Sequence, residues 1–202
     1  MMNNKGILIV LSGPAGTGKG TVCKEYLKTD PETVLSVSAT TRSPRPGEEH
    51  GREYYFITKD EFKKMIAEDG FLEHAEFCDN FYGTPLKAVN EKLESGLNVL
   101  LEIEVQGAMQ IKEKVPEAVL VFIAPPSKEI LRQRIEGRGT ETPEVIDKRM
   151  LAANDELKMM VNYDYVIVND EVEKAVKRFE NIINAERLKT KRCSKFIQEV
   201  CK

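Results

Sequence analysis

The sequence has few residues that bind metals or form disulfide bonds, and it has no long apolar run. Its 202 residues include 4 cysteines and 2 histidines, and no two cysteines have the C-x-x-C spacing of a zinc or redox site. No apolar stretch approaches the ~20 residues that span a bilayer. The sequence therefore argues against a structural zinc site, a disulfide framework and a membrane protein.

An excess of charge of one sign is also absent. The 30 Lys and Arg residues and the 33 Asp and Glu residues give a net charge of −3, which argues against a general nucleic-acid-binding surface. The apolar run that begins at Ile7 is shorter than the ~7–15 residues of a secretory signal. We therefore expect a cytoplasmic protein with reduced cysteines and with neither nucleic acid nor a membrane as a partner. The oligomeric state stays open.

Five short, apolar runs rich in β-branched residues alternate with segments that carry helix signals. The runs are residues 7–11, 34–37, 99–103, 119–123 and 165–168. Strands that are apolar on both faces are typical of parallel sheets covered by helices. The sequence therefore predicts an α/β fold, a three-layer core around a five-stranded parallel sheet.

Helix starts are predicted from local capping signals. Thr58-Lys-Asp-Glu61 fits a capping box, and Ser127 can cap a helix that extends through Glu136. Thr84 and Thr142 each precede a proline at an expected first helical position. The segment of about residues 38–90 differs from the rest because it concentrates Pro, Gly and aromatic residues, and we predict an inserted mixed α+β lobe there.

Residues 13–21 carry the strongest functional signal. They read Gly-Pro-Ala-Gly-Thr-Gly-Lys-Gly-Thr and lie between a predicted strand and a predicted helix, which is the setting of a P-loop. The glycines let backbone N–H groups point at phosphate oxygens, and Lys19 supplies a mobile charge for the β and γ phosphates. The residues predicted to bind a nucleoside triphosphate are Gly13, Pro14, Ala15, Gly16, Thr17, Gly18, Lys19, Gly20 and Thr21.

The magnesium ligand of a P-loop is missing from its usual place. Gly20 stands where the motif has Ser or Thr, and Thr21 comes one residue later. We expect Mg²⁺ to be held mainly by phosphates and water, with no certain protein ligand, and Thr21 to contact phosphate.

A second anion site is predicted after the second core strand. Arg42 and Arg45 lie in a loop stiffened by Pro44 and Pro46, and two guanidinium groups suit a dianionic phosphate because each donates in parallel to two oxygens. Tyr54 and Tyr82 can add neutral hydroxyl donors to the same anion.

These motifs together resemble the guanylate kinase family, from Ile7 to about Arg187. The resemblance rests on the P-loop, Ser38-Ala-Thr-Thr-Arg42-Ser-Pro-Arg45-Pro-Gly-Glu48, Tyr54-Tyr-Phe56, Phe81-Tyr82-Gly83-Thr84, Ile123-Ala-Pro-Pro-Ser127 and Glu136-Gly-Arg138-Gly-Thr-Glu141. It implies transfer of the γ-phosphoryl group of ATP to GMP, giving ADP and GDP, with Mg²⁺ and without a covalent intermediate. It also implies that one domain, residues 1–202, consists of a core at about 1–37 and 91–202, a GMP-binding lobe at about 38–90 and a flexible lid at about 126–158.

The resemblance assigns GMP-binding residues by motif position. Ser38, Arg42, Arg45, Tyr54 and Tyr82 would contact the GMP phosphate, and Glu73 and Thr84 the guanine. A carboxylate at position 73 also suits guanine chemically, because it offers acceptors to the N1–H and N2–H donors, whereas adenine presents an acceptor at N1. Strand alternation places Glu73 on one face with Phe71, Ala75 and Phe77, and an exposed strand carboxylate is an equal alternative.

Two further acids follow a core strand. Glu102 and Glu104 lie where open α/β sheets place ligand groups. We assign both to GMP binding, although their reach toward guanine or magnesium stays open. The alternative is a helix N-cap or a salt bridge.

The predicted catalytic residues are cations. Lys19, Arg134, Arg138 and Arg149 would stabilise the charge that develops on the transferred phosphoryl group, because phosphoryl transfer depends mainly on positioning and electrostatics. The three arginines could instead be ordinary surface residues of helices. Asn169, after the last core strand, is assigned to the adenine of ATP.

Two other functions remain possible at this point. One is a kinase for another nucleoside monophosphate, AMP, CMP or dTMP. The presence of both Glu73 and Thr84 is the feature that favours GMP over these substrates. The other is a non-enzymatic guanylate-kinase-like binding module, which the intact P-loop argues against.

Overall fold

A parallel sheet forms the centre of the computed structural model, which describes residues 5–137 and 142–202. The sheet has the strand order β2-β7-β1-β8-β9, and the five parallel strands predicted from the sequence are confirmed. Its strands are β2 (Thr33–Leu35), β7 (Asn98–Glu102), β1 (Leu8–Ser12), β8 (Val119–Ala124) and β9 (Tyr165–Val168). The carboxyl ends of these strands lie at one edge, where α/β proteins bind ligands.

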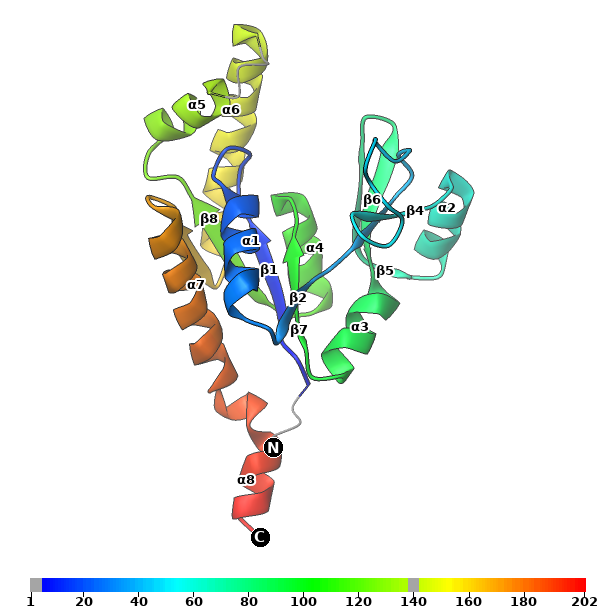
Figure 1. Cartoon of the computed structure of the whole chain (residues 1–202), viewed down its shortest axis with the longest axis vertical. Helices are drawn as coiled ribbons and strands as arrows, with labels where there is room; N and C mark the ends of the chain where they lie inside the picture. Colours follow the sequence, from blue (N-terminus) through cyan, green and yellow to red (C-terminus); the bar gives the residue numbers. More distant parts are fainter. Residues whose placement is uncertain (1–4, 138–141) are drawn as a thin grey trace.

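Helices cover both faces of this sheet (Figure 1). They are α1 (Lys19–Thr29) and α7 (Val172–Arg187) on one face, and α3 (Leu86–Glu94) and α4 (Val105–Lys114) on the other. Successive side chains of a strand point to opposite faces. Ile9 and Leu11 therefore pack in the cluster with α1 and α7, whereas Leu8 and Val10 pack in the cluster with α3 and α4. Burial on both faces explains the continuous apolar runs in the sequence.

A second sheet lies beside the core, at the right of Figure 1, with the order β4-β3-β6-β5. Its elements are β3 (Ser38–Thr40), β4 (Tyr54–Phe56), α2 (Lys59–Ala67), β5 (Phe71–Phe77) and β6 (Asn80–Pro85). β3 pairs with β4 in parallel, and the other pairs are antiparallel. The predicted mixed α+β lobe is therefore present, and it has its own small core of Ala39, Phe62 and Phe71.

Substitution of Phe62 should unfold the lobe and leave the main sheet folded. Phe62 is fully buried, and its ring stacks on Phe71 and Phe81 at centroid distances of 4.3 and 5.4 Å. Loss of a buried Phe costs about 3–5 kcal/mol, and Phe62 belongs to a cluster separate from those of the main sheet. We expect hydrogen exchange in Phe62→Ala to increase across the lobe and to stay unchanged in the main sheet.

Phe77→Ala is the matched control for this experiment, because Phe77 lies on β5 but is 69% exposed. An equal increase in hydrogen exchange across the lobe and the main sheet of Phe62→Ala would show that the two fold as one unit.

The predicted helix starts are confirmed at Thr58 and Ser127. Thr58 and Glu61 form a reciprocal capping box, and the Ser127 hydroxyl accepts the N–H of Ile130 at the start of α5 (Lys128–Glu136). α6 (Pro143–Lys158) begins with its proline in the first turn. The start predicted at Pro85 is wrong by one residue, because Pro85 is the extended N-cap and the Thr84 hydroxyl donates to Glu73 instead of capping the helix.

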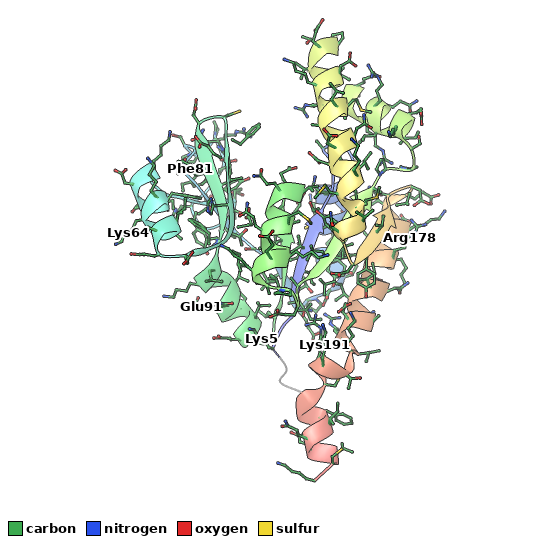
Figure 2. The ribbon with its side chains drawn as sticks, turned by 180° about the vertical axis from the view of Figure 1, so that it is seen from behind. Lys5, Lys64, Phe81, Glu91, Arg178 and Lys191 are labelled. Atoms are coloured by element: carbon green, nitrogen blue, oxygen red, sulfur yellow. The ribbon has the colours of Figure 1, made fainter. Side chains whose placement is uncertain are left out.

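The helices α5 and α6 stand at the upper end of the sheet, next to the loop between β1 and α1 (Figure 1). Seen from behind, α4 covers the sheet and the lobe lies apart from α6 (Figure 2). The chain ends with α8 (Ser194–Val200), after the short helices η1 (Met159–Asn162) and η2 (Thr190–Arg192). None of the helices among the described residues combines the length and apolar composition needed to cross a membrane.

Candidate functional site

Residues 13–21 connect the carboxyl end of β1 to the first turn of α1, as a P-loop does. Gly16 and Gly18 have φ angles of 88° and 85°, a region that glycine enters without steric cost. Within the part of the chain that the structure describes, the backbone N–H groups of Gly18, Lys19, Gly20 and Thr21 have no hydrogen-bond acceptor. Consecutive free N–H groups at a helix N-terminus form an anion-binding site.

The loop packs so tightly that two of its glycines cannot carry a side chain. A Cβ on Gly13 would lie 2.3 Å from the carbonyl oxygen of Ile123, and a Cβ on Gly18 would lie 2.5 Å from Nδ2 of Asn169. The ends of β8 and β9 therefore fix the path of the loop. The Lys19 ammonium folds over the loop and donates to the carbonyl oxygens of Gly13 and Pro14.

Glu102 lies against the loop and explains why position 20 is a glycine instead of the usual Ser or Thr. A Cβ at Gly20 would approach Oε1 of Glu102 to 3.2 Å, so a Ser or Thr at that position would displace the carboxylate. Burial raises the pKa of Glu102, the charge of Lys19 opposes that shift, and Glu104 adds to it. The carboxylate of Glu102 thus lies in the space that a Ser or Thr side chain at position 20 would need.

Two further acids face this region. Glu104 is exposed and occupies the N-cap position of α4, but its side chain makes no capping hydrogen bond. Glu156, on α6, is half-buried; burial first, then the charge of Glu104, raises its pKa, and Lys19 lowers it. The sequence did not single out Glu156, because it is one of several acids on a charged helix.

The oxygen-rich surroundings of the loop suit a hydrated magnesium ion bound with ATP. Glu102 offers a carboxylate that interacts with the charges of Lys19 and Glu104, and Mg²⁺ prefers oxygen ligands while retaining several waters. Among the described residues, no cluster of three or more His, Cys, Asp or Glu side chains could hold a metal by itself. The carboxylates present suit a hydrated ion, and the expectation that phosphates and water mainly hold it stays a prediction.

Glu73 and Thr84 form a buried pair in the lobe. The Thr84 hydroxyl donates to Oε1 of Glu73 at 2.6 Å, and the two residues are 0% and 6% exposed respectively. Burial raises the pKa of Glu73, while the bonds from Thr84 and the charge of Lys114 lower it. The alternative of an exposed strand carboxylate is therefore wrong.

A bulge in β5 accounts for the position of Glu73. The register with β6 shifts between Phe71 and His74, and Phe71, Leu72 and Glu73 are all buried in sequence. The simple alternation that placed Glu73 on one face with Phe71 and Phe77 is also wrong, because Phe77 is exposed and a bulge interrupts the period of two. Oε2 of Glu73 would lie 2.8 Å from a Cβ on Gly107, so this glycine leaves room beside the carboxylate.

A small cavity joins the lobe to the carboxyl end of the sheet. It has a volume of about 140 Å³ and is lined by four of the predicted GMP-binding residues, Ser38, Tyr54, Thr84 and Glu102. The cavity therefore brings residues from β3, β4, β6 and β7 to one place.

Arg42 is held by a carboxylate that the sequence did not assign. Its Nη2 donates to both carboxylate oxygens of Glu48, at 3.0 and 2.9 Å, and its Nη1 donates to the carbonyl of Ser43 at 2.7 Å. The Arg45 N–H also bonds Glu48 and, ahead of the Arg42 guanidinium, lowers the pKa of that carboxyl. Glu48 follows Arg42 by six residues in the quoted loop, and that spacing was the only available sequence signal.

Aromatic rings complete this part of the lobe. The guanidinium carbon of Arg42 lies 5.5 Å from the ring centroid of Tyr54, which packs edge-on against Tyr82 at 6.1 Å. Burial and then Tyr82 raise the pKa of Tyr54, so its hydroxyl remains a neutral donor. Arg45 is exposed. Ser38, Arg42, Tyr54 and Tyr82 are thus brought together as predicted, and the Arg45 side chain lies at the surface of the same loop.

The predicted catalytic arginines lie on or near α5 and α6. Arg134, on α5, donates from Nη2 to the carbonyl oxygen of Asn169 at 2.9 Å. Arg149, on α6, is half-buried and engaged with a neighbouring group. Arg138 lies outside the described residues.

Asn169 lies beneath the phosphate-binding loop. It is 3% exposed, and its Nδ2 donates to the carbonyl oxygen of Thr17 at 2.7 Å. One N–H of its amide is thus engaged, whereas its Oδ1 is buried without a hydrogen-bond partner in the described part of the chain. The predicted contact with adenine stays a prediction.

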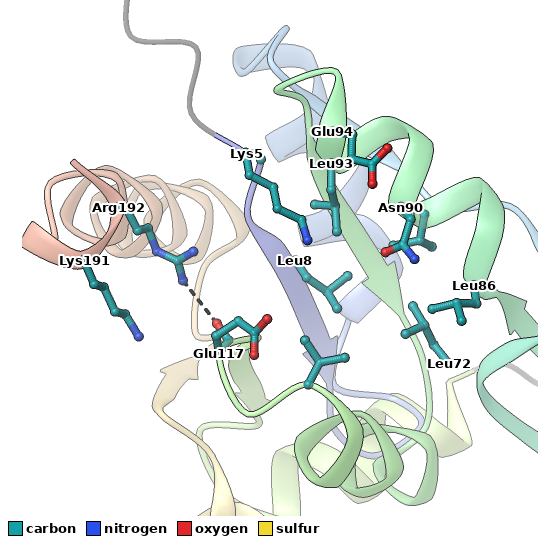
Figure 3. A pocket seen from close by; sticks show the side chains of 13 residues that line it. Lys5, Leu8, Leu72, Leu86, Asn90, Leu93, Glu94, Glu117, Lys191 and Arg192 are labelled. Carbon is teal, nitrogen blue, oxygen red and sulfur yellow. Dashed lines mark hydrogen bonds between the residues drawn. The ribbon is translucent and has the colours of Figure 1, made fainter. Parts of the chain in front are cut away.

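A cavity of about 530 Å³ lies elsewhere, where β1 begins (Figure 3). Leu8, Leu72 and Leu93 contribute to its apolar lining, and Lys5 and Arg192 contribute charges. Because it lies at the amino-terminal end of β1, away from the P-loop, it is separate from the site described above.

Comparisons with known proteins find one family that matches nearly the whole chain. The model of the family described as guanylate kinase matches residues 5–186. A guanylate kinase of Latilactobacillus sakei is 56% identical over 95% of this chain and 95% of its own length, and one of Desulfitobacterium hafniense is 53% identical over 95% and 96%. The crystal structure of a guanylate kinase from Anaplasma phagocytophilum has a TM-score of 0.74 at 37% identity, and covers 94% of this chain and 90% of its own.

Proposed function

The chain belongs to the guanylate kinase family and transfers the γ-phosphoryl group of ATP to GMP, and we propose that residues 13–21 bind ATP while the lobe binds GMP. The products are ADP and GDP. The comparisons support neither the alternative of another monophosphate kinase nor that of a non-enzymatic module.

The observation that carries the assignment of the lobe is the buried Glu73–Thr84 pair. An ionised carboxylate only accepts hydrogen bonds, and guanine presents two adjacent donors, N1–H and N2–H. Thr84 occupies one side of Oε1 at 2.6 Å and fixes the orientation of the carboxylate. Adenine would place its N1 lone pair against the same carboxylate and be repelled, so Glu73 selects guanine.

The GMP phosphate would lie among Ser38, Arg42, Arg45, Tyr54 and Tyr82. Glu48 holds the Arg42 guanidinium by two hydrogen bonds, and a guanidinium has five donors, so Arg42 can keep this orientation while it donates to phosphate. Glu102 and Glu104 lie between this lobe and the loop, and we assign them to the GMP-binding side of the site.

Charge stabilisation in the transition state would come from Lys19, Arg134, Arg138 and Arg149. The transferred phosphoryl group gathers charge on its equatorial oxygens, so converging cations and free N–H groups lower the barrier. Mg²⁺, held mainly by phosphates and water with Glu102 beside Gly20 as a candidate carboxylate, would neutralise phosphate charge when bound with ATP. Closure of the lobe at about 38–90 and of the lid at about 126–158 would exclude water from the phosphoryl group.

The four cysteines are free, which supports the further proposal that the protein acts in the reducing cytoplasm.

A panel of monophosphates tests the proposed function. ADP release from ATP and Mg²⁺ should be rapid with GMP, slow with AMP, CMP or dTMP, and negligible with no monophosphate, as measured in a coupled assay. Rapid ADP release without GMP would contradict the proposed exclusion of water, and preferred use of AMP would contradict the role of Glu73.

A further inference from the structure

Asn169 connects the last strand of the sheet to the phosphate-binding loop. Its backbone N–H donates to the carbonyl of Ala124 at 2.9 Å and so extends the pairing of β8 with β9. Its side-chain Nδ2 donates to the carbonyl oxygen of Thr17 at 2.7 Å. The backbone of Asn169 is thus bonded to the sheet, and its side chain is bonded to the loop.

This hydrogen bond determines the direction of the next N–H group. The peptide between Thr17 and Gly18 is planar and trans, so its C=O and N–H point in opposite directions. Because Asn169 draws the Thr17 carbonyl toward the core, the Gly18 N–H points away from the core. That N–H has no acceptor among the described residues and is the first of the four free N–H groups of the loop.

The surroundings leave the Asn169 amide little freedom. Arg134 donates to the backbone carbonyl oxygen of Asn169 at 2.9 Å, and a Cβ on Gly18 would lie 2.5 Å from the side-chain Nδ2. Asn169 is therefore bonded to α5 through its backbone carbonyl and to the loop through its side chain. A shift of the side-chain amide would rotate the Thr17–Gly18 peptide.

We propose that Asn169 is a positioning residue for ATP: its amide orients the Thr17–Gly18 peptide so that the Gly18 N–H faces the triphosphate. This inference rests on the proposed use of residues 13–21 for ATP. The predicted contact with adenine is a separate role, because Nδ2 keeps a second N–H and Oδ1 has no hydrogen-bond partner among the described residues, so adenosine binding tests it independently.

Asn169→Ala should weaken binding of every ligand that uses the phosphate cradle. A buried carbonyl left without its donor costs about 1–3 kcal/mol, which corresponds to roughly a 5- to 150-fold loss of affinity. We expect the KM for ATP and the inhibition constant of tripolyphosphate to rise by the same factor, while the inhibition constant of adenosine and the affinity for GMP stay unchanged. Steady-state kinetics with each inhibitor against ATP measures all of these values.

Tripolyphosphate and adenosine separate the two roles of Asn169, since each contains only one part of ATP. An increased inhibition constant for adenosine, together with an unchanged inhibition constant for tripolyphosphate, would overturn the inference and establish an adenine contact. Asn184→Ala is the matched control, because Asn184 is an exposed asparagine on α7.

Asn169→Asp provides a pH readout that a general loss of packing would not give. A protonated carboxyl can donate to the Thr17 carbonyl, whereas an ionised one cannot. Relative to the native enzyme at the same pH, kcat/KM for ATP in Asn169→Asp should recover as the pH falls, and that in Asn169→Ala should not. If the ratio of kcat/KM for ATP between Asn169→Asp and the native enzyme does not change with pH, the inference is overturned. Asn169→Asp also provides the test if Asn169→Ala does not fold.

Failure of this inference is distinguishable from failure of the proposed function. If the native enzyme phosphorylates GMP but Asn169→Ala and Asn169→Asp bind tripolyphosphate normally, only the positioning role is wrong. If the native enzyme does not phosphorylate GMP, the proposed function itself is wrong.

Discussion

Lys19→Ala is expected to lower kcat by about 100- to 1,000-fold, as loss of one preorganised charge or donor at a transition state does. Lys19 is the first residue of α1, and its ammonium lies over the loop, where it donates to the carbonyls of Gly13 and Pro14. A triphosphate in the loop would place its β and γ oxygens within reach of this charge. Stopped-flow or coupled assays of ADP release measure the effect.

The same variant should keep its affinity for GMP, because Lys19 lies outside the lobe. Lys24→Ala is the control, since Lys24 is an exposed lysine on the same helix, and its kcat should match that of the native enzyme. Retention of full turnover by Lys19→Ala would mean that residues 13–21 do not hold the reacting phosphates.

Glu73→Gln is expected to raise the KM for GMP by about 10- to 100-fold, which corresponds to the roughly 1.5–3 kcal/mol of one hydrogen bond to a charged group. The amide offers one acceptor and one donor in place of two acceptors, so half of its edge opposes the donors of guanine. The KM for ATP should stay within about threefold of the native value, because Glu73 does not contribute to the phosphate loop.

Stability measurements separate this effect from unfolding. The pKa of Glu73 is raised in the folded protein, so its contribution favours folding at acid pH and is lost as the pH rises through that raised pKa. Above that raised pKa the ionised, buried carboxylate destabilises the free enzyme. Glu73→Gln should therefore have an equal or higher Tm at a pH above that pKa while binding GMP more weakly.

The exposed acid Glu76, on the same strand, provides the control Glu76→Gln, for which neither KM nor Tm should change. A lowered Tm together with parallel losses for ATP and GMP would assign Glu73 a structural role only.

The core of the fold was predictable because its signals are local. Five apolar runs identified the strands, since a parallel strand buried on both faces must be apolar throughout. The capping box at Thr58 and the cap at Ser127 were predictable for the same reason, because each involves residues three apart. The P-loop pattern likewise combines its glycines and lysine within nine consecutive residues.

The remaining features depend on contacts that no local pattern encodes. Asn169 reaches Thr17 across 152 positions, and sequence spacing cannot show that β9 ends beneath the loop. Glu73 is buried because β5 contains a bulge, which breaks the alternation used to place it. Thr84 donates to Glu73 rather than capping α3, so a tertiary hydrogen bond overrides a local signal.

The most direct test of the account is the binding of a bisubstrate analogue in which adenosine and guanosine are joined 5′ to 5′ by a chain of five phosphates. If the loop and the lobe hold two nucleotides that face each other, calorimetry should show one analogue per chain, bound at least about 100-fold more tightly than ATP or GMP alone. The affinity should fall in both Lys19→Ala and Glu73→Gln. Tighter binding of the corresponding analogue with two adenosines, or an affinity no better than that of ATP alone, would contradict the account.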